Sequence, residues 1–315
     1  MPDAVRRIIE ERAEAAGFAA LKRAAAALSD AYREGCAPAL ARIPAEERTA
    51  AYLVTRMPAT YAAAFHALRE LAGRLAEPPA EILDLGAGTG AASLAARHWF
   101  PGARIIMVER DSALADAARA WLPEARTIIA DATRMDPVPP CDLAIAAYSL
   151  GEFGSSVAAR MWQAARLGLL VLEPGTPRGF ALVRAVRDEL LASGAHIAAP
   201  CPAEGPCPMA AGDWCHFAAR VERSSLHRRL KNAELGHEDE KFSYIALVRR
   251  REGRAKARIV RHPRQQPGLI TIDLCTPAGL QSQSIPKRDR EAFRAARKAV
   301  WGGEWAGHTP ASRET

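Results

Sequence analysis

The feature that most constrains this sequence is an apolar segment, a glycine-rich turn and an amphipathic segment in direct succession. Residues 81–86 (EILDLG) predict a buried strand, and residues 91–100 (AASLAARHWF) predict a helix. Between them, Gly86, Gly88 and Gly90 allow a sharp turn in which a ligand lies against bare backbone. The amino terminus of the helix that follows favours a negative group at this turn. We therefore expect an α/β domain that binds a nucleotide-containing ligand here.

Strands and helices continue to alternate after this turn. Further apolar runs lie at 103–110, 125–131, 141–150 and 167–175, and helical patterns separate them. Such alternation predicts an α/β fold with a doubly wound, Rossmann-like parallel sheet. Ligands of these sheets bind beyond the carboxyl ends of the strands.

An acidic residue is placed where the ribose of such a ligand would lie. Glu109 ends the second strand, nineteen residues beyond Gly90, and a carboxylate there accepts hydrogen bonds from ribose hydroxyls. Two ligands remain open. With Gly86, Gly88 and Ala91, the segment matches the dinucleotide fingerprint of nicotinamide enzymes. As D-L-G-x-G-x-G, it resembles the first motif of class I S-adenosylmethionine-dependent methyltransferases.

Two further acids favour the methyltransferase interpretation. Asp84 lies inside the first strand, and Asp131, in the segment IIADAT, ends the third. In class I methyltransferases, the acid at the position of Asp131 faces the adenine. We therefore expect S-adenosylmethionine as the cofactor; the alternative is a degenerate pocket that binds nothing. The predicted cofactor-binding residues are Asp84, Gly86, Gly88, Gly90, Glu109 and Asp131.

The segment after the fourth strand is where methyl transfer would take place. It reads AAYSLGEF, in which Tyr148 is a candidate for stacking on a base and Glu152 for proton transfer. The Asn-Pro-Pro-Tyr type of motif found in amino-methylating enzymes is missing here. Catalytic residues are therefore not assigned beyond these two candidates, and Tyr148 has ordinary packing as its alternative role.

Three of the six cysteines fall within fifteen residues. Cys201, Cys207 and Cys215 lie in a proline-rich segment that cannot form regular secondary structure over its length. A metal centre would order such a segment, because its binding free energy becomes folding free energy. Zinc sites favour tighter spacings, so an iron–sulfur cluster suits this spacing better; buried thiols are a further alternative. Candidates for the fourth ligand are His196, His216, His227 and Cys275, whereas Cys36 and Cys141 are poorer candidates.

Residues 200–231 (PCPAEGPCPMAAGDWCHFAARVERSSLHRRLK), residues 238–249 (EDEKFSYIALVR) and a later cysteine together carry a resemblance. The sequence resembles the mitochondrial small-ribosomal-subunit methyltransferase-like family and its bacterial relatives over roughly residues 50–290. The resemblance implies a class I methyltransferase fold and association with small-subunit ribosomal RNA during assembly. It also implies a [4Fe–4S] cluster, whose ligands here would be Cys201, Cys207, Cys215 and Cys275.

Positive charge is concentrated in the second half of the chain. Residues 216–264 hold 14 Lys or Arg and 6 Asp or Glu, in a chain whose net charge is +7. Such a segment can neutralise RNA phosphates, and a solvated basic face is the alternative. The predicted RNA-binding residues are Arg223, Arg228, Arg229, Lys231, Arg249, Arg250, Arg251 and Lys256.

These observations predict five regions and one overall function. We expect N-terminal helices (1–78), a methyltransferase core (79–192), a cysteine-rich and basic segment (193–241), a last core strand with a small β module (242–300), and a disordered tail (301–315). No transit peptide or membrane segment is visible, so we expect a cytoplasmic, monomeric, bacterial family member. The expected function is binding of small-subunit ribosomal RNA in ribosome assembly or translation. Methylation of ribosomal RNA, or of a small molecule, is the alternative.

Overall fold

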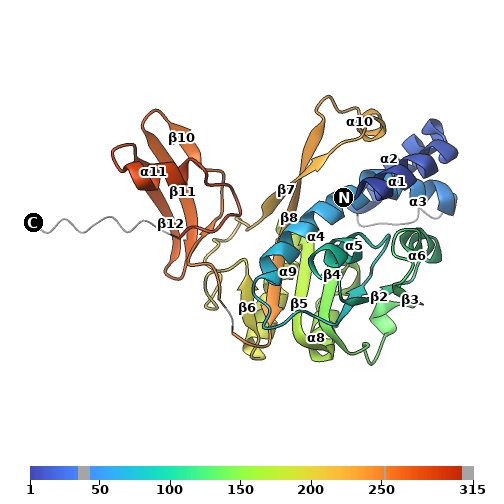
Figure 1. The fold of residues 1–315 in the computed structure, drawn as a ribbon, viewed down its shortest axis with the longest axis horizontal. Coiled ribbons are helices and arrows are strands. Elements are labelled where there is room, and N and C mark those ends of the chain that lie inside the picture. The colour runs from blue at the N-terminus through green and yellow to red at the C-terminus, as the bar shows by residue number, and fades with distance from the viewer. Residues whose placement is uncertain (35–42, 252, 307–315) are drawn as a thin grey trace, which may run out of the picture.

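The computed structural model describes residues 1–34, 43–251 and 253–306, and it opens with four helices (Figure 1). Three of them, α1 (Asp3–Ala16), α2 (Phe18–Glu34) and α3 (Ala45–Thr55), pack on one another. The fourth, α4 (Met57–Ala72), lies against the sheet and places Leu68 and Leu71 in the main core. The N-terminal helices are thus a layer of the main body.

The central sheet is mixed. Its strand order is β3-β2-β1-β4-β5-β8-β6, and β7 pairs with β8 beyond this path. The first five strands are parallel, whereas β8 is antiparallel to both β5 and β6. The strands are β1 (Glu81–Leu85), β2 (Arg104–Glu109), β3 (Arg126–Ile129), β4 (Cys141–Ala147), β5 (Ala165–Pro174), β6 (His196–Ala199), β7 (Phe217–Glu222) and β8 (His237–Val248).

Apolar layers cover both faces of this sheet, as a doubly wound fold requires. One layer joins the N-terminal helices to α5 and α6, and the other contains α8 and α9. Buried residues alternate between the two layers along β1, where Ile82 faces the first layer and Leu83 the second. The helices after α4 are α5 (Ala91–Trp99), α6 (Ser112–Arg119), α7 (Leu150–Phe153), α8 (Ser156–Ala164) and α9 (Pro177–Ala192).

Strand β8 is longer than its neighbours and serves two structures. Its second half lies in the sheet, and its first half pairs with β7 to form a hairpin that carries α10 (Ser225–Lys231). The hairpin extends toward the N-terminal helices (Figure 1), and Arg229 of α10 lies 4.4 Å from the ring centroid of Phe18 in α2.

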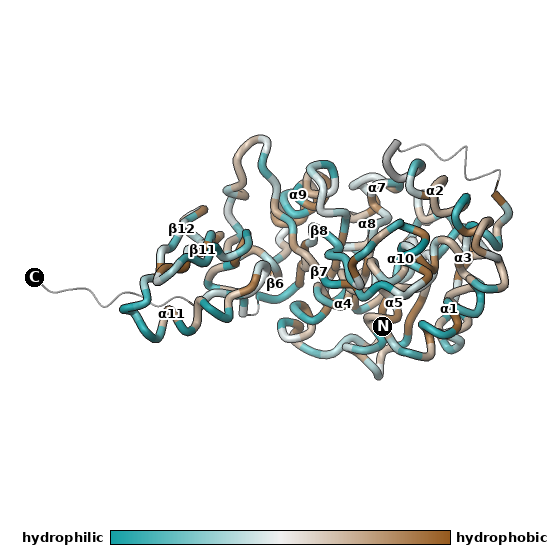
Figure 2. Tube along the Cα trace, turned by 90° about the horizontal axis from the view of Figure 1, so that it is seen from above, coloured by the Kyte–Doolittle hydropathy of each residue, from teal (hydrophilic) through white to brown (hydrophobic). Residues whose placement is uncertain are grey.

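The C-terminal residues form a separate module beside the β6 edge of the sheet (Figures 1 and 2). Ile270, Ile272 and Leu274 of the module pack with Ile285 in a core of their own. The module consists of β9 (Arg258–Ile259), β10 (Arg264–Gln266), β11 (Leu269–Thr276), β12 (Gly279–Pro286) and α11 (Arg290–Ala296).

The expectation of a disordered tail from residue 301 is wrong for residues 301–306. Trp305 is buried, its backbone N–H donates to Ala257, and its indole Nε1 donates to Gln283 at 2.8 Å. Trp305 packs in the core of the module, and its burial stabilises the docked position of residues 301–306. The remaining expected tail, residues 307–315, lies outside the described residues.

None of the helices in the described ranges is long and apolar enough to cross a lipid bilayer.

Candidate functional site

The glycine loop folds back over the end of β2. The backbone N–H groups of Gly86 and Ala87 both donate to the carbonyl oxygen of Val108. Gly86 has a φ of 76°, and a Cβ there would lie 2.7 Å from side-chain atoms of Ser149 and Phe153. Gly86 is therefore required both for the left-handed turn and for the close approach of α7.

The two acids nearest this loop have different roles. Glu109 accepts hydrogen bonds from the N–H groups of Gly88 and Asp111, each at 2.8 Å, and so joins the glycine loop to the start of α6. Asp84 is fully buried and accepts from the backbone N–H and Oγ of Ser93 at 3.0 and 2.6 Å. Burial raises the pKa of Asp84 to about 6, against the effect of these hydrogen bonds. Asp84 thus fixes the first turn of α5.

A cavity of about 150 Å³ lies beyond the carboxyl ends of β1, β2 and β4. Gly86, Gly88, Glu109, Tyr148 and Glu152 all line it, so the fold brings together five of the residues that the sequence singled out. Sequence reasoning missed Tyr52, Ser149 and Phe153, which also line this cavity. The close contact of Ser149 and Phe153 with the glycine loop depends on the fold and has no local sequence signal.

Three predicted cofactor residues do not line the cavity: Asp84, Gly90 and Asp131. The neighbours of Asp131, Ala130 and Ala132, do line it. Asp131 accepts hydrogen bonds from the Oγ1 and N–H of Thr133 at 2.6 and 2.9 Å, and these bonds lower its pKa. Its carboxylate therefore caps the short 3-10 helix that begins at Ala132.

The two catalytic candidates lie at the cavity wall and its rim. Tyr148 has a φ of 58°, which is costly for a residue with a side chain, and its hydroxyl donates to Glu240 at 2.8 Å. Burial and the nearby Glu240 carboxylate raise the pKa of Tyr148 well above 10. Glu152 is exposed and forms an ion pair with Arg110 at 3.0 Å.

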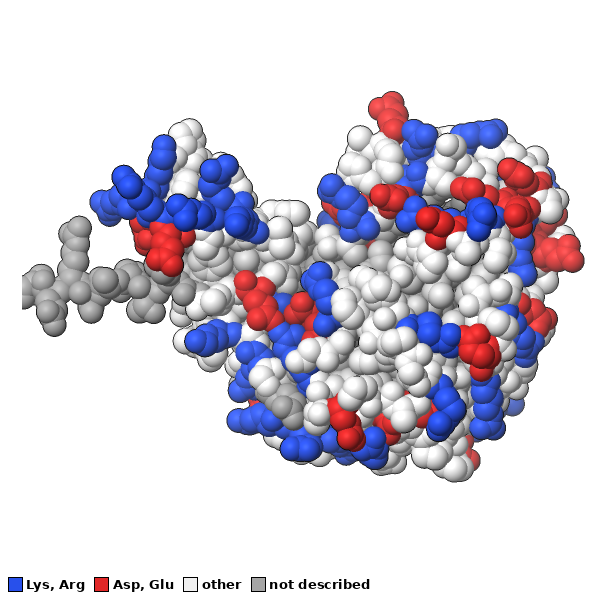
Figure 3. All heavy atoms as spheres, in the orientation of Figure 1, with Lys and Arg blue, Asp and Glu red and all other residues white. Residues whose placement is uncertain are grey.

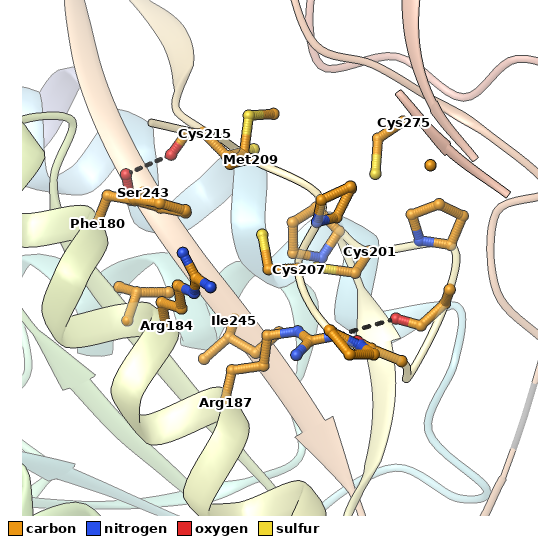
Figure 4. A pocket seen from close by; sticks show the side chains of 18 of the residues that line it. Phe180, Arg184, Arg187, Cys201, Cys207, Met209, Cys215, Ser243, Ile245 and Cys275 are labelled. Carbon is orange, nitrogen blue, oxygen red and sulfur yellow. Dashed lines mark hydrogen bonds between the residues drawn. The ribbon is translucent and has the colours of Figure 1, made fainter. Parts of the chain in front are cut away.

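A second cavity, of about 140 Å³, lies between the core and the C-terminal module. Cys201, Cys207, Cys215 and Cys275 all line it (Figure 4). The first two lie on the loop after β6, the third lies two residues before β7, and the fourth is on β11. The histidines predicted as alternative fourth ligands, His196, His216 and His227, do not line this cavity.

The other two cysteines have separate environments. Cys141 is buried in β4, away from this cavity, and Cys36 lies outside the described residues. Among the residues that the structure describes, no group of three or more His, Cys, Asp or Glu side chains is arranged to hold a metal ion.

Two buried arginines hold the walls of the cysteine cavity. Arg187 of α9 is 5% exposed and donates to the carbonyl oxygens of Ala203 and Gly205 in the cysteine loop. Arg258 of β9 is 1% exposed and donates to the carbonyl oxygen of Pro200 at 3.0 Å.

The four thiols are partly shielded from water. Burial raises the pKa of Cys215 well above its usual value and that of Cys275 to about 12, and the neighbouring thiols add to both effects. Burial also raises the pKa of Cys201, although Arg187 opposes this. Raised pKa values are expected for thiols that lie close together in an environment of low dielectric constant, because the charged thiolate is disfavoured there.

Most cations predicted to bind RNA are engaged within the protein. Arg223 and Lys231 both contact Glu238, at 2.7 and 2.9 Å, and Arg251 contacts Glu204 at 2.6 Å. The guanidinium of Arg249 lies 3.9 Å from the ring centroid of Trp162. Arg229, as noted, lies over Phe18. The three that have no such partner in the described ranges are Arg228, Arg250 and Lys256.

The fold and the site together define a class. Five parallel strands in the order β3-β2-β1-β4-β5 are followed by β8, which is antiparallel to both its neighbours, and by β6, which runs in the direction of the first five. With a glycine loop after β1, this is the sheet of a class I methyltransferase. The antiparallel β8 distinguishes this sheet from the parallel dinucleotide-binding fold.

The chain belongs to the family described as mitochondrial small ribosomal subunit Rsm22, whose model matches residues 46–306. One relative is the human ribosome assembly protein METTL17, mitochondrial, which is 26% identical over 282 residues. Another is the Rsm22-cox11 tandem protein 2, mitochondrial, of Schizosaccharomyces pombe, 25% identical over 329 residues. These alignments cover 80% and 83% of this chain, which spans 61% and 43% of the two relatives.

Solved structures show a more distant likeness. The plantazolicin methyltransferase BpumL in complex with SAH is 13% identical, with a TM-score of 0.41, over 78% of this chain and all of that one. The protein PH1948 from Pyrococcus horikoshii is 16% identical, with a TM-score of 0.38, over 59% of this chain and 79% of that one.

Proposed function

We propose that this protein binds small-subunit ribosomal RNA and acts in ribosome assembly or translation, and that a [4Fe–4S] cluster joins its core to its C-terminal module. The observation that carries the proposal is the meeting of four cysteine side chains, from two distant segments, in one cavity. The family match, and the name of the human relative, support the association with the small ribosomal subunit.

The donor set fits a cluster better than zinc. Structural zinc sites usually have tighter cysteine spacings, whereas Cys201, Cys207 and Cys215 have five and seven residues between them. A four-iron cluster is larger than a single ion and takes one thiolate at each iron. Cys201, Cys207, Cys215 and Cys275 would hold it, and when bound it would supply a rigid cross-link between segments.

The surrounding residues already shape the site for such a cross-link. Arg187 fixes the loop between Cys201 and Cys207 through two carbonyl oxygens. Ser243 of β8 donates its hydroxyl to the carbonyl oxygen of Cys215 at 2.7 Å. Strand β11 carries Cys275 and so brings the module to the same cavity. We infer a structural role for the cluster, which would keep the module docked on the core.

The cluster is tested by anaerobic purification, followed by an absorption spectrum and by iron, sulfide and zinc analysis. We expect a brown protein with about four irons per chain. A Cys207→Ser variant should lose the iron, whereas Cys141→Ser, which alters a buried cysteine outside the cavity, should keep it. A colourless protein with one zinc, or a Cys207→Ser variant that keeps its iron, would contradict the assignment.

RNA binding is tested separately. We expect tight association with a small-subunit ribosomal RNA transcript that weakens steeply with added salt. A wild-type protein with no affinity for this RNA would refute the ribosomal function, whatever its metal content.

A second candidate function is methylation of that RNA. The cavity that Gly86, Gly88 and Glu109 line supports S-adenosylmethionine as a ligand. The experiment is incorporation of labelled methyl groups in the presence and absence of the RNA. Incorporation that depends on RNA favours the enzyme, and binding without incorporation favours an assembly factor. Turnover on a small molecule by a protein with no RNA affinity would favour the remaining alternative, a small-molecule methyltransferase. A cytoplasmic location and a monomeric state remain predictions.

A further inference from the structure

We propose that RNA docks on the exposed face of α11 and the turn before it, instead of on the basic segment that the sequence indicates. This inference rests on the proposed function, because it assigns the surface through which ribosomal RNA is bound. We call this surface the α11 cation face; it consists of Lys287, Arg288, Arg290, Arg294, Arg297 and Lys298.

The helix presents these cations on its side away from the module. Ala292 and Ala296 are buried in the module core, and α11 packs against β11 and β12. Arg290, Arg294 and Arg297 are spaced by four and three residues, which places them on one helical face opposite these alanines. Figure 3 shows Lys and Arg side chains gathered over the upper part of the C-terminal lobe.

Few acids offset the charge of this face: residues 287–298 contain only Asp289 and Glu291, and Asp289 caps α11 through the N–H of Ala292. None of its six cations forms an ion pair or side-chain hydrogen bond with the described part of the chain. In the β7–β8 hairpin, by contrast, acids of β8 pair with the cations opposite, as in Arg223–Glu238 and Arg220–Asp239. A cation already in such a pair gains less from a phosphate, since it must first give up its carboxylate.

The chemistry of the face fits an RNA backbone. Four of the six cations are arginines, whose planar guanidinium groups bind phosphate oxygens in pairs. Gln281 and Gln265 are exposed on the same sheet face as α11, because they pair with Leu274 and Ile270 in adjacent strands. Their amides can hydrogen-bond the ribose 2′-hydroxyl, which distinguishes RNA from DNA.

A lipid surface fits this face less well. A helix that lies on a membrane inserts an apolar face into the lipid, and the apolar side of α11 is already buried in the module. The remaining phosphate-bearing partner of suitable size is a nucleic acid, and the proposed function selects RNA.

The test compares two variants that each lose three positive charges. One is Arg290→Gln/Arg294→Gln/Arg297→Gln on the α11 cation face. The control is Arg7→Gln/Arg12→Gln/Lys22→Gln, which removes exposed cations of α1 and α2 that form no ion pair with another described residue. Binding of a fluorescein-labelled small-subunit ribosomal RNA transcript is measured by titration at several salt concentrations, and circular dichroism confirms that both variants fold.

We expect the α11 variant to bind at least about 10-fold more weakly than wild type, with a salt slope lower by about 3, and the control to stay within about 3-fold. Equal effects of the two variants would overturn the inference while leaving the proposed function intact. Binding of wild type to vesicles that contain phosphatidylserine, with no preference for RNA, would also overturn it. A wild type that does not bind RNA would refute the proposed function itself.

Discussion

Arg258 is the residue whose loss should destabilise the protein most through charge. It is buried, and its Nη1 lies 2.9 Å both from Glu70 of α4 and from the carbonyl oxygen of Gly302. Its Nε donates to the carbonyl oxygen of Pro200 at the start of the cysteine loop. One side chain thus connects the N-terminal helices, the cysteine loop and the C-terminal module, and Arg258→Met would disconnect all three.

The magnitude follows from the burial of the pair. Removing one partner of a buried ion pair costs about 3–5 kcal/mol when the other charge is left without compensation. Glu70 keeps Arg74 at 3.3 Å and Arg69 at 3.5 Å, so we expect a loss toward the lower end of that range. Arg104 offers a matched control, because it pairs with Glu81 at 3.2 Å with its own side chain 75% exposed. Arg104→Met should cost less than about 1 kcal/mol.

The same reasoning predicts a pH dependence. Burial by itself would raise the pKa of Glu70, but Arg258, with smaller contributions from Arg74 and His66, lowers it below its usual value of 4.5. A carboxyl with a lowered folded pKa stabilises the protein above about pH 4.5, and this contribution is lost as the pH falls through the folded value. The difference between wild type and Arg258→Met should therefore be largest at neutral pH and shrink in acid, where Glu70 becomes neutral.

Urea unfolding of wild type and both variants, at neutral pH and in acid, measures these differences. A loss below about 1 kcal/mol for Arg258→Met at neutral pH, equal to that of Arg104→Met, would refute the argument from burial. So would a difference that grows as the pH falls.

Three further predictions concern other parts of the molecule. Burial raises the pKa of Glu173 to about 7, so this carboxyl binds its proton more tightly in the folded protein than in the unfolded chain. The stability that this proton contributes is therefore lost as the pH rises from about 4.5 to 7. Glu173→Gln should make the melting temperature less dependent on pH over this range, and an unchanged pH profile would contradict the raised pKa of Glu173. Gly86→Ala should cost about 1–3 kcal/mol and weaken binding of S-adenosylmethionine, measured by calorimetry, because of its positive φ and the contact with Phe153. Gly154→Ala, with a φ of 81° and open space around it, should cost less and spare binding. Trp305→Ala should destabilise the C-terminal module by about 3–5 kcal/mol, which would be measured as faster proteolysis within residues 257–306. If the variant resists protease as well as the wild type does, Trp305 does not stabilise the module.

The sequence was most informative where a feature depends on neighbouring residues. The strand, glycine turn and helix around Gly86 are one local unit, so their pattern predicts both the structure of the turn and its place at the carboxyl ends of the parallel strands. The position of β8 between β5 and β6 was not predictable in the same way, because strand pairing over such distances depends on the whole fold.

The site residues divide along the same line. The sequence motif predicts a cofactor contact for Asp84. In the structure its carboxylate accepts hydrogen bonds from Ser93 inside the core. The cations of the basic segment predict RNA binding, but many of them pair with acids such as Glu238, which lies on the opposing strand. Trp305 was a signal within the expected tail, since a large aromatic side chain gains most from burial.

The position of β6 affects the order in which a growing chain can fold. Strand β6 hydrogen-bonds to β8 and to no other strand in the described part of the chain. As the protein is synthesised, the five parallel strands are complete at Pro174, but β6 has no neighbour until β8 has left the ribosome. During this interval the loop that follows β6 has Arg187 of α9 as a partner but not yet Arg258 of β9. The fourth cysteine of the cavity arrives later still, on β11. Any group that all four thiols enclose is therefore taken up only after β11 has been synthesised.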